Sequence, residues 1–482
     1  MLELAPDLVS ALRAAVPGGV LTEPVDLIAY GFDATFFDDR PPLVVLPTTT
    51  AQVSAVHRLA STYRVAITPR AMGSGLSGGA IPLRGSIVLG VAKMNAILEI
   101  DEVDRVAVVQ AGVINADLQA AVEKRGLFYP PDPSSLKQSA IGGNVAENAG
   151  GARCLKYGVT GDYVLALEVV LPDGTVIRTG GRTVKNVTGY DLRRLFTGAE
   201  GTLGTITEIT LRLLAKPAIA RTALAVFDRI EDAANAVTAV LGAGVLPTAI
   251  EMIDQFTMRC IEDNKPVGLP LDAAAILIFG VDGNHAGAVA DDLAAIDRLT
   301  RASGARDVQV AQTDADAEKL WTARRSINPS LARRRPNRLG EDICVPRRAI
   351  LPMIRRIAEI REKYRLELPL YGHIGDGNLH PNLLCDKRDP EEMRRVEAAA
   401  REIFEAAVEL GGTLSGEHGI GLLKKQFMEL DLGADVLALM RRIKDAIDPL
   451  GIMNPGKVFP DPGGIDAFHL PTSARRKDNR TI

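Results

Sequence analysis

Two histidines on either side of a sharp turn could hold a metal ion. They are His373 and His380, in the segment YGHIGDGNLHPNLL. The dipeptide Asp376-Gly377 favours a two-residue hairpin turn, and strand pairing outward from it places the two imidazoles opposite each other, with Cβ atoms about 5 Å apart. With the carboxylate of Glu417 as a third ligand, this set suits Zn, Mn, Fe or Co, and we favour Zn or Mn. The alternative is a stacked pair of histidines that binds no metal.

A glycine-rich loop earlier in the chain could bind a phosphate. Within PRAMGSGLSGGA, Gly73, Gly75 and Gly78 match the GxGxxG pattern of dinucleotide-binding loops. That pattern must open a helix, but Pro82 and Gly85 follow and a strand comes next, so we expect a loop that runs from strand to strand. Its backbone N–H groups and its two serines could still surround an anion. The alternative is an ordinary glycine-rich turn.

Three further segments are rich in glycine, asparagine and threonine, as a backbone that lies against a ligand would be. They read PPDPSSLKQSAIGGNVAENAGG (130–151), VKNVTGYDL (184–192) and FTGAEGTLG (196–204). Glycine pairs allow the main chain to approach a flat ring or a pyrophosphate, because no Cβ intervenes. Together with the loop at 69–80, these segments indicate a site wrapped around one cofactor.

Short strands and longer helices must position these segments. Strand-like runs are LVVLP from Leu43, RVAITP, SIVLGV, 106–109, 166–171, 203–214 and 274–281. Helical patterns cover 2–16, 50–63, 231–242, 286–303, 391–410 and 434–447. The character of the chain changes after Lys216-Pro217, where Ala-rich helices begin to alternate with apolar strands, which indicates a separate domain.

We expect an α+β protein of more than one domain, because 482 residues exceed what one hydrophobic core serves. The expected divisions are a ligand-binding domain at 1–217, a cap domain for the substrate at 218–412, and a C-terminal segment at 413–465 that completes the active site and the first domain. The polar, basic tail at 466–482 is expected to be disordered.

The composition excludes several classes of function. Lys and Arg total 56 and Asp and Glu total 60, so a net charge of −4 gives no general attraction to nucleic acid or to an anionic membrane. No apolar run reaches the about 18–20 residues of a membrane span, and the N-terminus lacks a secretory signal. The four cysteines are scattered without a CxxC pair, so we expect reduced thiols in the cytoplasm and no iron–sulfur cluster.

The order of the motifs resembles a known flavoprotein family, the one named for vanillyl-alcohol oxidase and p-cresol methylhydroxylase. The matching motifs are PRAMGSGLSGGA, PPDPSS, GGNVAENAGG, KYGVTGDYV, VKNVTGYDL, GAEGTLG and, at the end, NPGKVFP. The resemblance covers nearly the whole chain and points to the branch of glycolate oxidase flavin subunits, D-lactate dehydrogenases and D-2-hydroxyglutarate dehydrogenases. It implies a two-part FAD-binding domain of the p-cresol methylhydroxylase type, an α+β cap domain, and a C-terminal helical segment that returns to the FAD-binding domain.

The resemblance also implies a bound FAD. A covalent tether through a histidine of the glycine-rich segments is excluded, because no histidine lies between residues 58 and 284. The residues implied at the cofactor are Pro69, Arg70, Gly73, Ser74, Gly75, Leu76, Ser77, Gly78, Gly79, Pro131, Asp132, Ser135, Gly142, Gly143, Asn148, Gly151, Gly201, Ile206 and Asn454.

The implied reaction oxidises a small D-2-hydroxy acid, of the D-lactate, glycolate or D-2-hydroxyglutarate type, to the 2-keto acid, with hydride passing to flavin N5. His418 matches the family's base, and an imidazole with a pKa of about 6.5 accepts a proton at neutral pH. Arg324 matches the arginine that binds the substrate carboxylate, and Asn382 matches a substrate-contacting position. The metal would bind the hydroxyl and carboxylate oxygens of the substrate.

Alternatives stay open for several of these residues. His418 could be a structural histidine, and the other five arginines of 320–338 are more typical of a solvated charge run. Asn328 stands where a dicarboxylate-specific relative has a threonine, and no lysine precedes Glu341-Asp342, which argues against D-2-hydroxyglutarate without excluding it. The rival functions are a flavin-binding subunit that is not itself catalytic and a metal-dependent oxygenase without flavin.

The reduced flavin must pass its electrons on, and the chain has neither iron–sulfur ligands nor an obvious NAD fold. We expect an electron-acceptor protein or a quinone-linked subunit as partner, in a homodimer or an oxidase complex, with direct use of oxygen also open. The protein would lie in the cytoplasm, or at the membrane through that partner, with no transmembrane segment and no bound nucleic acid.

Overall fold

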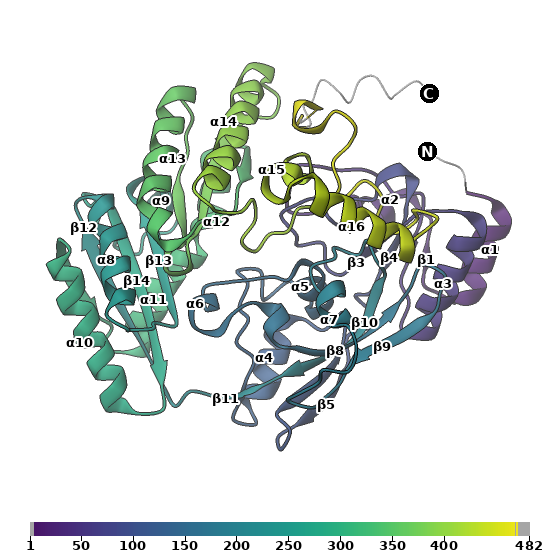
Figure 1. Cartoon of the computed structure of the whole chain (residues 1–482), viewed down its shortest axis with the longest axis horizontal. Helices are drawn as coiled ribbons and strands as arrows, with labels where there is room; N and C mark the ends of the chain where they lie inside the picture. Colours follow the sequence, from purple (N-terminus) through teal and green to yellow (C-terminus); the bar gives the residue numbers. More distant parts are fainter. Residues whose placement is uncertain (1–3, 468, 471–482) are drawn as a thin grey trace. The chain divides into compact units, whose positions relative to one another are not determined.

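The computed structural model describes residues 4–467, 469 and 470 (Figure 1). The described chain forms two compact units. The first consists of the chain up to Gly150 with Val159–Lys216 and Glu417–Ala467, and the second of Gly151–Gly158 and Pro217–Gly416 with His469 and Leu470. The mixture of helices and sheets confirms the expected α+β class. Most of the tail for which we expect disorder, 471–482, lies outside the described residues.

The first unit contains a small sheet that carries the glycine-rich loop. Its order is β1 (Val20–Leu21), β2 (Val44–Val45), β4 (Ile87–Gly90) and β3 (Ile67–Arg70), with β2, β4 and β3 parallel. Helix α3 (Thr50–Tyr63) joins the parallel strands β2 and β3, which lie on either side of β4, and its N-cap Thr49 accepts the N–H of Gln52. The loop joins β3 to β4 through a 3-10 turn at Leu83–Gly85, which confirms the expected strand-to-strand connection.

A five-stranded antiparallel sheet forms the other part of the first unit. Its spatial order is β5 (Ile97–Asp101), β6 (Val106–Gln110), β10 (Thr205–Arg212), β8 (Val164–Val170) and β9 (Val176–Gly180). The short helix α5 (Ile141–Glu147) packs against β6 and β10. This packing brings the second glycine-rich segment onto the sheet.

Shorter elements complete the first unit. They are α1 (Pro6–Ala15), α2 (Pro24–Ile28), α4 (Asn115–Glu123), α7 (Leu192–Phe196), α15 (Met428–Leu432), α16 (Ala434–Ile447), and the paired strands β7 (Leu127–Phe128) and β11 (Leu214–Ala215). The segment after α16 returns to β3, where the Ile67 N–H donates to Ile452 and the Asn454 N–H donates to Ile67, at 2.8 and 2.7 Å. The segment Glu417–Ala467 therefore belongs to the first unit.

The second unit is built on one large antiparallel sheet. Its order is β15 (Ala305–Val310), β12 (Ile219–Phe227), β14 (Ala275–Gly283), β13 (Ala249–Asp254), β18 (Leu370–His373), β19 (Asn378–Cys385) and β16 (Asn337–Gly340), and β17 (Ile343–Cys344) also pairs with β19. Strands β13 and β19 are buried along their whole length. Such strands need cover on both faces of the sheet.

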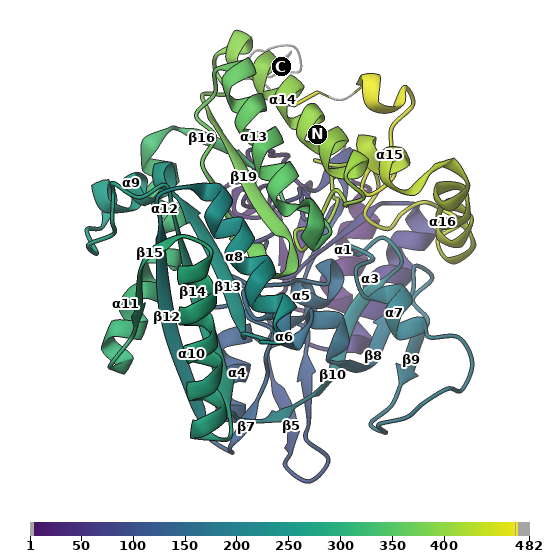
Figure 2. The same cartoon turned by 60° about the vertical axis from the view of Figure 1, so that its left-hand side comes forward.

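Helices supply that cover (Figure 2). α9 (Gln255–Asn264), α11 (Asp314–Arg325) and α12 (Ile327–Arg334) pack on one face, around Ile253, Ile276 and Tyr371. α8 (Ile230–Gly242) and α10 (Ala286–Ala302) pack on the other face, α13 (Ile350–Tyr364) and α14 (Pro390–Glu409) pack on each other, and α6 (Cys154–Tyr157) contacts β13. Among the described residues, none of these helices combines the length and apolar character that a membrane crossing requires.

Candidate functional site

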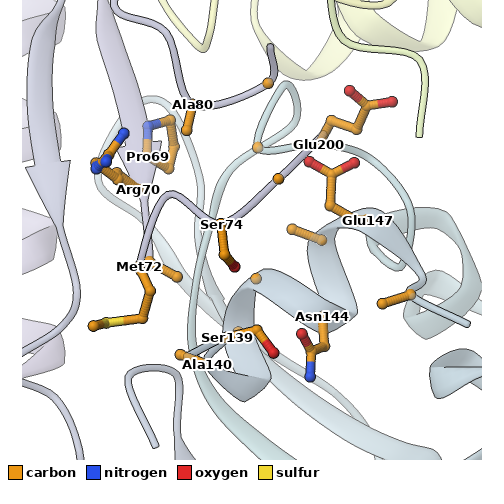
Figure 3. A pocket seen from close by; sticks show the side chains of 18 of the residues that line it. Pro69, Arg70, Met72, Ser74, Ala80, Ser139, Ala140, Asn144, Glu147 and Glu200 are labelled. Atoms are coloured by element: carbon orange, nitrogen blue, oxygen red, sulfur yellow. The ribbon is translucent and has the colours of Figure 1, made fainter. Parts of the chain in front are cut away.

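Three of the four glycine-rich segments, which lie far apart in sequence, meet around one cavity in the first unit (Figure 3). Its volume is about 1310 Å³ when the space at its open mouth is included. The loop after β3, helix α5 and the segment 199–206 form most of its wall. Glu417 and His418, at the start of the C-terminal segment, also line it.

Most of the residues predicted to hold FAD line this cavity. They are Pro69, Arg70, Gly73, Ser74, Gly75, Leu76, Gly79, Ser135, Gly142, Gly143, Gly201 and Ile206. The remaining predicted residues are not among the lining residues: Ser77, Gly78, Pro131, Asp132, Asn148, Gly151 and Asn454. The segment 184–192 does not line the cavity either, although its composition suggested that it would. Which residues touch FAD stays a prediction.

Two of the predicted residues that do not line the cavity hold its wall from behind. Asn454 donates through Nδ2 to the carbonyl oxygens of Gly79 and Glu200, at 3.0 and 2.7 Å. Asn148 ends α5 in the left-handed conformation, and its Oδ1 accepts the N–H of Gly161 at 2.8 Å. Both asparagines therefore position lining segments.

Two glycines let bare backbone form part of the wall. A Cβ on Gly142 would lie 2.6 Å from Cβ of Ala111 and 2.7 Å from its carbonyl oxygen, so no larger residue fits there without a shift. Gly201 has a φ of +67°, which other residues rarely adopt, and a Cβ there would lie 3.1 Å from Pro69. A flat or phosphate-bearing ligand can approach such a wall closely.

Several buried polar atoms on the cavity wall have no hydrogen-bond partner among the described residues (Figure 3). They are Arg70 Nη1, Ser139 Oγ, Asn144 Nδ2 and Glu147 Oε2. Buried polar groups are nearly always hydrogen-bonded, and leaving one unsatisfied costs about 1–3 kcal/mol. These atoms therefore indicate a polar ligand that completes the cavity.

Two carboxylates meet at one side of the cavity (Figure 3). Glu200 accepts the N–H groups of Ile420 and Gly421, each at 2.7 Å. Burial, and then the charges of Glu200 and Asp33, raise the pKa of Glu147 well above its usual 4.5. Neither acid is among the residues predicted from sequence, although each is the single acid of a glycine-rich motif and could have been found by that sign.

The predicted hairpin that carries His373 and His380 is wrong in its turn and its register. The strands β18 and β19 pair His373 with Asn378 and Tyr371 with His380, and the four residues Ile374–Gly377 connect them. The histidines still share a face, because the register differs by two residues and side chains alternate with a period of two. Their ring centroids lie 5.2 Å apart, with the rings at 88°.

A buried carboxylate on β13 joins a predicted metal ligand to a predicted substrate-binding residue. Glu251 is 0% exposed; its Oε1 accepts from Nδ1 of His373, and its Oε2 accepts from Nε of Arg324. Burial acts to raise the pKa of Glu251, but the charges of Arg324 and His373 outweigh it and lower the pKa to about 2. Because an ionised carboxylate only accepts, Nδ1 of His373 carries a proton; in the neutral ring, the form that a metal requires, the lone pair is then on Nε2.

A second carboxylate faces the other histidine. Asp342 is buried, and its Oδ1 lies 3.5 Å from Nδ1 of His380. Asn378 and Ser415 donate to the Asp342 carboxylate at 2.7 and 2.8 Å, and the N–H of Gly416 donates to its backbone carbonyl at 3.0 Å. Each predicted histidine ligand thus has a carboxylate beside Nδ1, which is the usual surrounding of metal-bound histidines.

Asn382 lies on the same face as His380, two residues farther along β19. Its Nδ2 donates to the carbonyl of His380 at 3.0 Å, and its Oδ1 accepts from Arg338 at 3.3 Å. Arg338 also donates to Asn328 at 2.6 Å. This arginine is therefore part of the site surroundings and not of the solvated charge run expected for it. The second unit brings together four predicted residues: Arg324, His373, His380 and Asn382.

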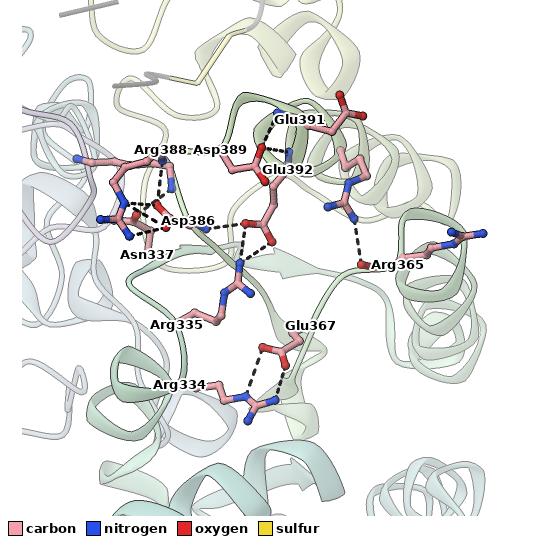
Figure 4. Close-up of polar contacts among 12 residues, drawn as sticks. Arg334, Arg335, Asn337, Arg365, Glu367, Asp386, Arg388, Asp389, Glu391 and Glu392 are labelled. Atoms are coloured by element: carbon pink, nitrogen blue, oxygen red, sulfur yellow. Dashed lines mark hydrogen bonds and ion pairs between the residues drawn. The ribbon is translucent and has the colours of Figure 1, made fainter. Parts of the chain in front are cut away.

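Arg335, also expected in the charge run, is instead half-buried and paired (Figure 4). It donates to both carboxylate oxygens of Glu392, at 2.7 and 2.6 Å. Glu392 also accepts the N–H of Asp386 at 2.8 Å, and Asp389 caps α14 by accepting the N–H groups of Glu391 and Glu392. These contacts fix the start of α14 behind β19 and give Arg335 a structural role.

Glu417 and His418 lie together at the cavity of the first unit. Nε2 of His418 is 3.8 Å from Oε1 of Glu417, and both residues line the cavity. The predicted base is therefore part of the wall that the predicted cofactor residues form.

Two family models match this chain. Residues 41–180 match the family described as FAD binding domain, and residues 216–458 match FAD linked oxidases, C-terminal domain. The chain is 47% identical over 433 residues to glycolate oxidase subunit GlcD of Bacillus subtilis (strain 168), covering 90% of this chain and 92% of that protein. It is 35% identical over 468 residues to D-2-hydroxyglutarate dehydrogenase of Stutzerimonas stutzeri (strain A1501), covering 94% and 99%.

Solved structures show the same architecture. Substrate-bound p-cresol methylhydroxylase matches with a TM-score of 0.79 at 19% identity, covering 94% of this chain and 96% of that chain. An identity this low shows the fold alone, and it confirms the expected p-cresol methylhydroxylase type of fold. On the two family matches and the identity to its relatives, the chain belongs to the FAD-linked oxidase family.

Proposed function

We propose that this protein oxidises a small D-2-hydroxy acid to the 2-keto acid, using FAD as hydride acceptor and a divalent metal at the substrate. The relatives are named for glycolate and for D-2-hydroxyglutarate, both of which are 2-hydroxy acids. One observation carries the proposal. His418, which can accept a proton, lines the same cavity as the glycine-rich backbone and its unsatisfied polar atoms.

The cavity wall fits FAD. Bare backbone at Gly142 and Gly201 admits a flat ring or a pyrophosphate, and the unsatisfied groups of Ser139 and Asn144 can meet its polar atoms. The predicted residues that line the cavity would contact FAD without a covalent bond, and residues such as Asn454 would support them from behind. When bound, FAD supplies a two-electron acceptor for hydride.

The donor set of the second unit suits Zn or Mn. His373 and His380 offer imidazole nitrogens, and the contact of His373 Nδ1 with Glu251 puts the lone pair of the neutral ring on Nε2, the tautomer that would bind a metal. Glu417 is the proposed third ligand. The metal would polarise the substrate hydroxyl and lower its pKa.

Three side chains would then handle the substrate. Arg324 would bind the carboxylate, because a guanidinium can donate two parallel hydrogen bonds to it. Asn382 would contact a substrate oxygen through its amide. His418 would accept the proton of the C2 hydroxyl. Holding the carboxylate and the hydroxyl at once leaves one orientation for the C2–H bond, which would select one enantiomer.

We further propose that electrons leave through a partner subunit or a quinone-linked acceptor. The relative from Bacillus subtilis is named a subunit of glycolate oxidase. The four cysteines of this chain include no CxxC pair that would suggest an iron–sulfur relay of its own. The protein would work in the cytoplasm or at a membrane through that partner.

Anaerobic titration of the FAD-loaded protein with glycolate, the two lactate enantiomers and D-2-hydroxyglutarate tests the proposal. We expect one FAD per chain, bleaching of the flavin by glycolate or by D-lactate but not by L-lactate, and slower bleaching after a chelator, restored by Zn²⁺ or Mn²⁺. A preparation without flavin, or a flavin that none of these acids reduces, would show that the proposal is wrong.

A further inference from the structure

We propose that Glu251 is a positioning residue that holds His373 and Arg324 in one hydrogen-bonded unit and thereby sets metal affinity and substrate binding together. The inference rests on the proposed function, in which His373 binds the metal and Arg324 binds the substrate carboxylate. Glu251 itself touches neither metal nor substrate. It acts through the two side chains that do.

Strand register brings Glu251 to His373. The antiparallel strands β13 and β18 pair Met252 with Gly372, so the next position along the same register sets Glu251 opposite His373. The last turn of α11, which packs on this face of the sheet, delivers Arg324. Three elements that are far apart in sequence thus converge on one carboxylate.

The contact with Glu251 determines which nitrogen of His373 can bind a metal. Glu251 accepts from Nδ1, so the ring cannot turn over without breaking a buried hydrogen bond. Nε2 then keeps its lone pair for the metal. Metal-bound histidines commonly donate their second N–H to a carboxylate, and removing that partner typically costs about 10–100-fold in metal affinity.

The other carboxylate oxygen of Glu251 fixes Arg324. It accepts from Nε, while the guanidinium lies over the ring of Tyr371, 5.0 Å from the ring centroid. The hydrogen bond and the contact with the ring together restrict the guanidinium. An arginine held in this way loses less conformational freedom when it binds a carboxylate.

Folding alone does not call for a charge at this position. Glu251 is 0% exposed and lies between the buried apolar residues Ile250 and Met252. Buried ion pairs are often no more stabilising than apolar side chains of similar size. A carboxylate with a separate partner on each oxygen is better explained by the two side chains that it orients.

The variant Glu251→Gln tests this inference in the FAD-loaded protein. Glutamine has the same shape but one acceptor oxygen, so it can accept from His373 or from Arg324, and its NH₂ group faces the other. The protein is stripped with a chelator and titrated with Zn²⁺ against a chromogenic chelator. We expect the Zn²⁺ dissociation constant to rise about 10–100-fold, and KM for the reducing hydroxy acid to rise about 10-fold, with wild-type FAD content.

Asp254 provides a matched control on the same strand. It is also buried, but its carboxylate accepts the backbone N–H groups of Thr257 and Leu370, which are structural contacts. Asp254→Asn should lower Tm and leave the Zn²⁺ dissociation constant and KM within about twofold of wild type. The comparison separates positioning from general loss of a buried carboxylate.

The outcomes also separate this inference from the proposed function. A wild-type protein that neither binds Zn²⁺ nor is reduced by hydroxy acids would disprove both the proposed function and this inference. If the wild type does both, the inference alone is overturned when E251Q keeps the wild-type dissociation constant and KM, or when D254N shifts them equally. If E251Q does not fold, Glu251→Asp replaces it, because aspartate withdraws the carboxylate by one methylene. We expect the Zn²⁺ dissociation constant and KM to rise in this variant too, but by less. Wild-type values of both in E251D would overturn the inference.

Discussion

The acid pair on the cavity wall makes stability depend on pH. Burial, followed by Glu200 and Asp33, raises the pKa of Glu147 above its ordinary 4.5, so the folded protein favours the protonated form more than the unfolded chain does. Such a group contributes stability that is fully present below the unfolded pKa and is lost as pH rises through the folded pKa. The window of loss therefore begins near pH 4.5 and extends upward.

Glu147→Gln should consequently gain in Tm over the wild type as pH rises. Glutamine keeps the shape of the side chain and has no proton to lose, so its stability does not follow this dependence. Calorimetry of the FAD-saturated proteins at about pH 5 and about pH 8 measures the difference. A gap in Tm that is the same at both values would argue against the raised pKa.

Motifs and spacing single out His373, His380 and Arg324 as candidate site residues, and the second unit brings them together, while their roles stay predictions. Glu251 could not be predicted, because its role depends on the register between strands whose contacting residues are 122 positions apart. A lone acid in the apolar run AIEMI was the available sign, since a buried acid demands a partner.

The connection between β18 and β19 does not follow the local turn preference of its Asp-Gly sequence. Asp-Gly favours a two-residue turn in a hairpin, but here Ile374 is fully buried, and a Cβ on Gly375 would lie 2.6 Å from Leu155 and 3.1 Å from Ile250. The connection packs against the rest of the unit, and Gly377 closes it with a φ of +85°. Packing, and not local turn preference, set its length.

Gly377→Ala should destabilise this connection and weaken Zn²⁺ binding. Its Cβ would lie 2.0 Å from the carbonyl oxygen of Val345, in addition to the strain of a positive φ. Gly244→Ala is the control, because Gly244 has a φ of +82° with nothing within 4 Å. We expect G244A to lose about 1–2 kcal/mol of unfolding free energy and to bind Zn²⁺ normally.

Urea unfolding and Zn²⁺ titration of the two variants measure this difference. G377A should unfold at lower urea than G244A and should bind Zn²⁺ more weakly. Equal midpoints together with unchanged Zn²⁺ affinity in G377A would mean that the connection does not position the histidines.

Elements with strong periodicity could be predicted nearly to the residue, and short elements could not. The segments 50–63 and 434–447 are helices with those bounds. Helix α5 was not predicted, because its seven residues include Gly142 and Gly143, and glycine disfavours a helix. Its packing against β6 and β10 stabilises it, and Gly142 allows the close approach to Ala111.

At the scale of the whole molecule, the resemblance of motifs predicted a fold that local patterns could not. The five-stranded sheet sets β10 between β6 and β8, and Glu208 pairs with Gln110 across nearly a hundred residues of chain. No periodicity in either strand specifies that partner. The family matches at 41–180 and 216–458 support the family that the motifs predicted.

The central claim is that His418 removes the substrate proton while FAD accepts the hydride. The most direct measurement is anaerobic, single-turnover reduction of the bound flavin in the wild type and in His418→Asn, with FAD content determined for both. We predict equal FAD content and a reduction rate that falls about 10²–10⁴-fold in the variant, with no recovery on adding Zn²⁺ or Mn²⁺. Reduction of the variant's flavin at the wild-type rate would contradict the account.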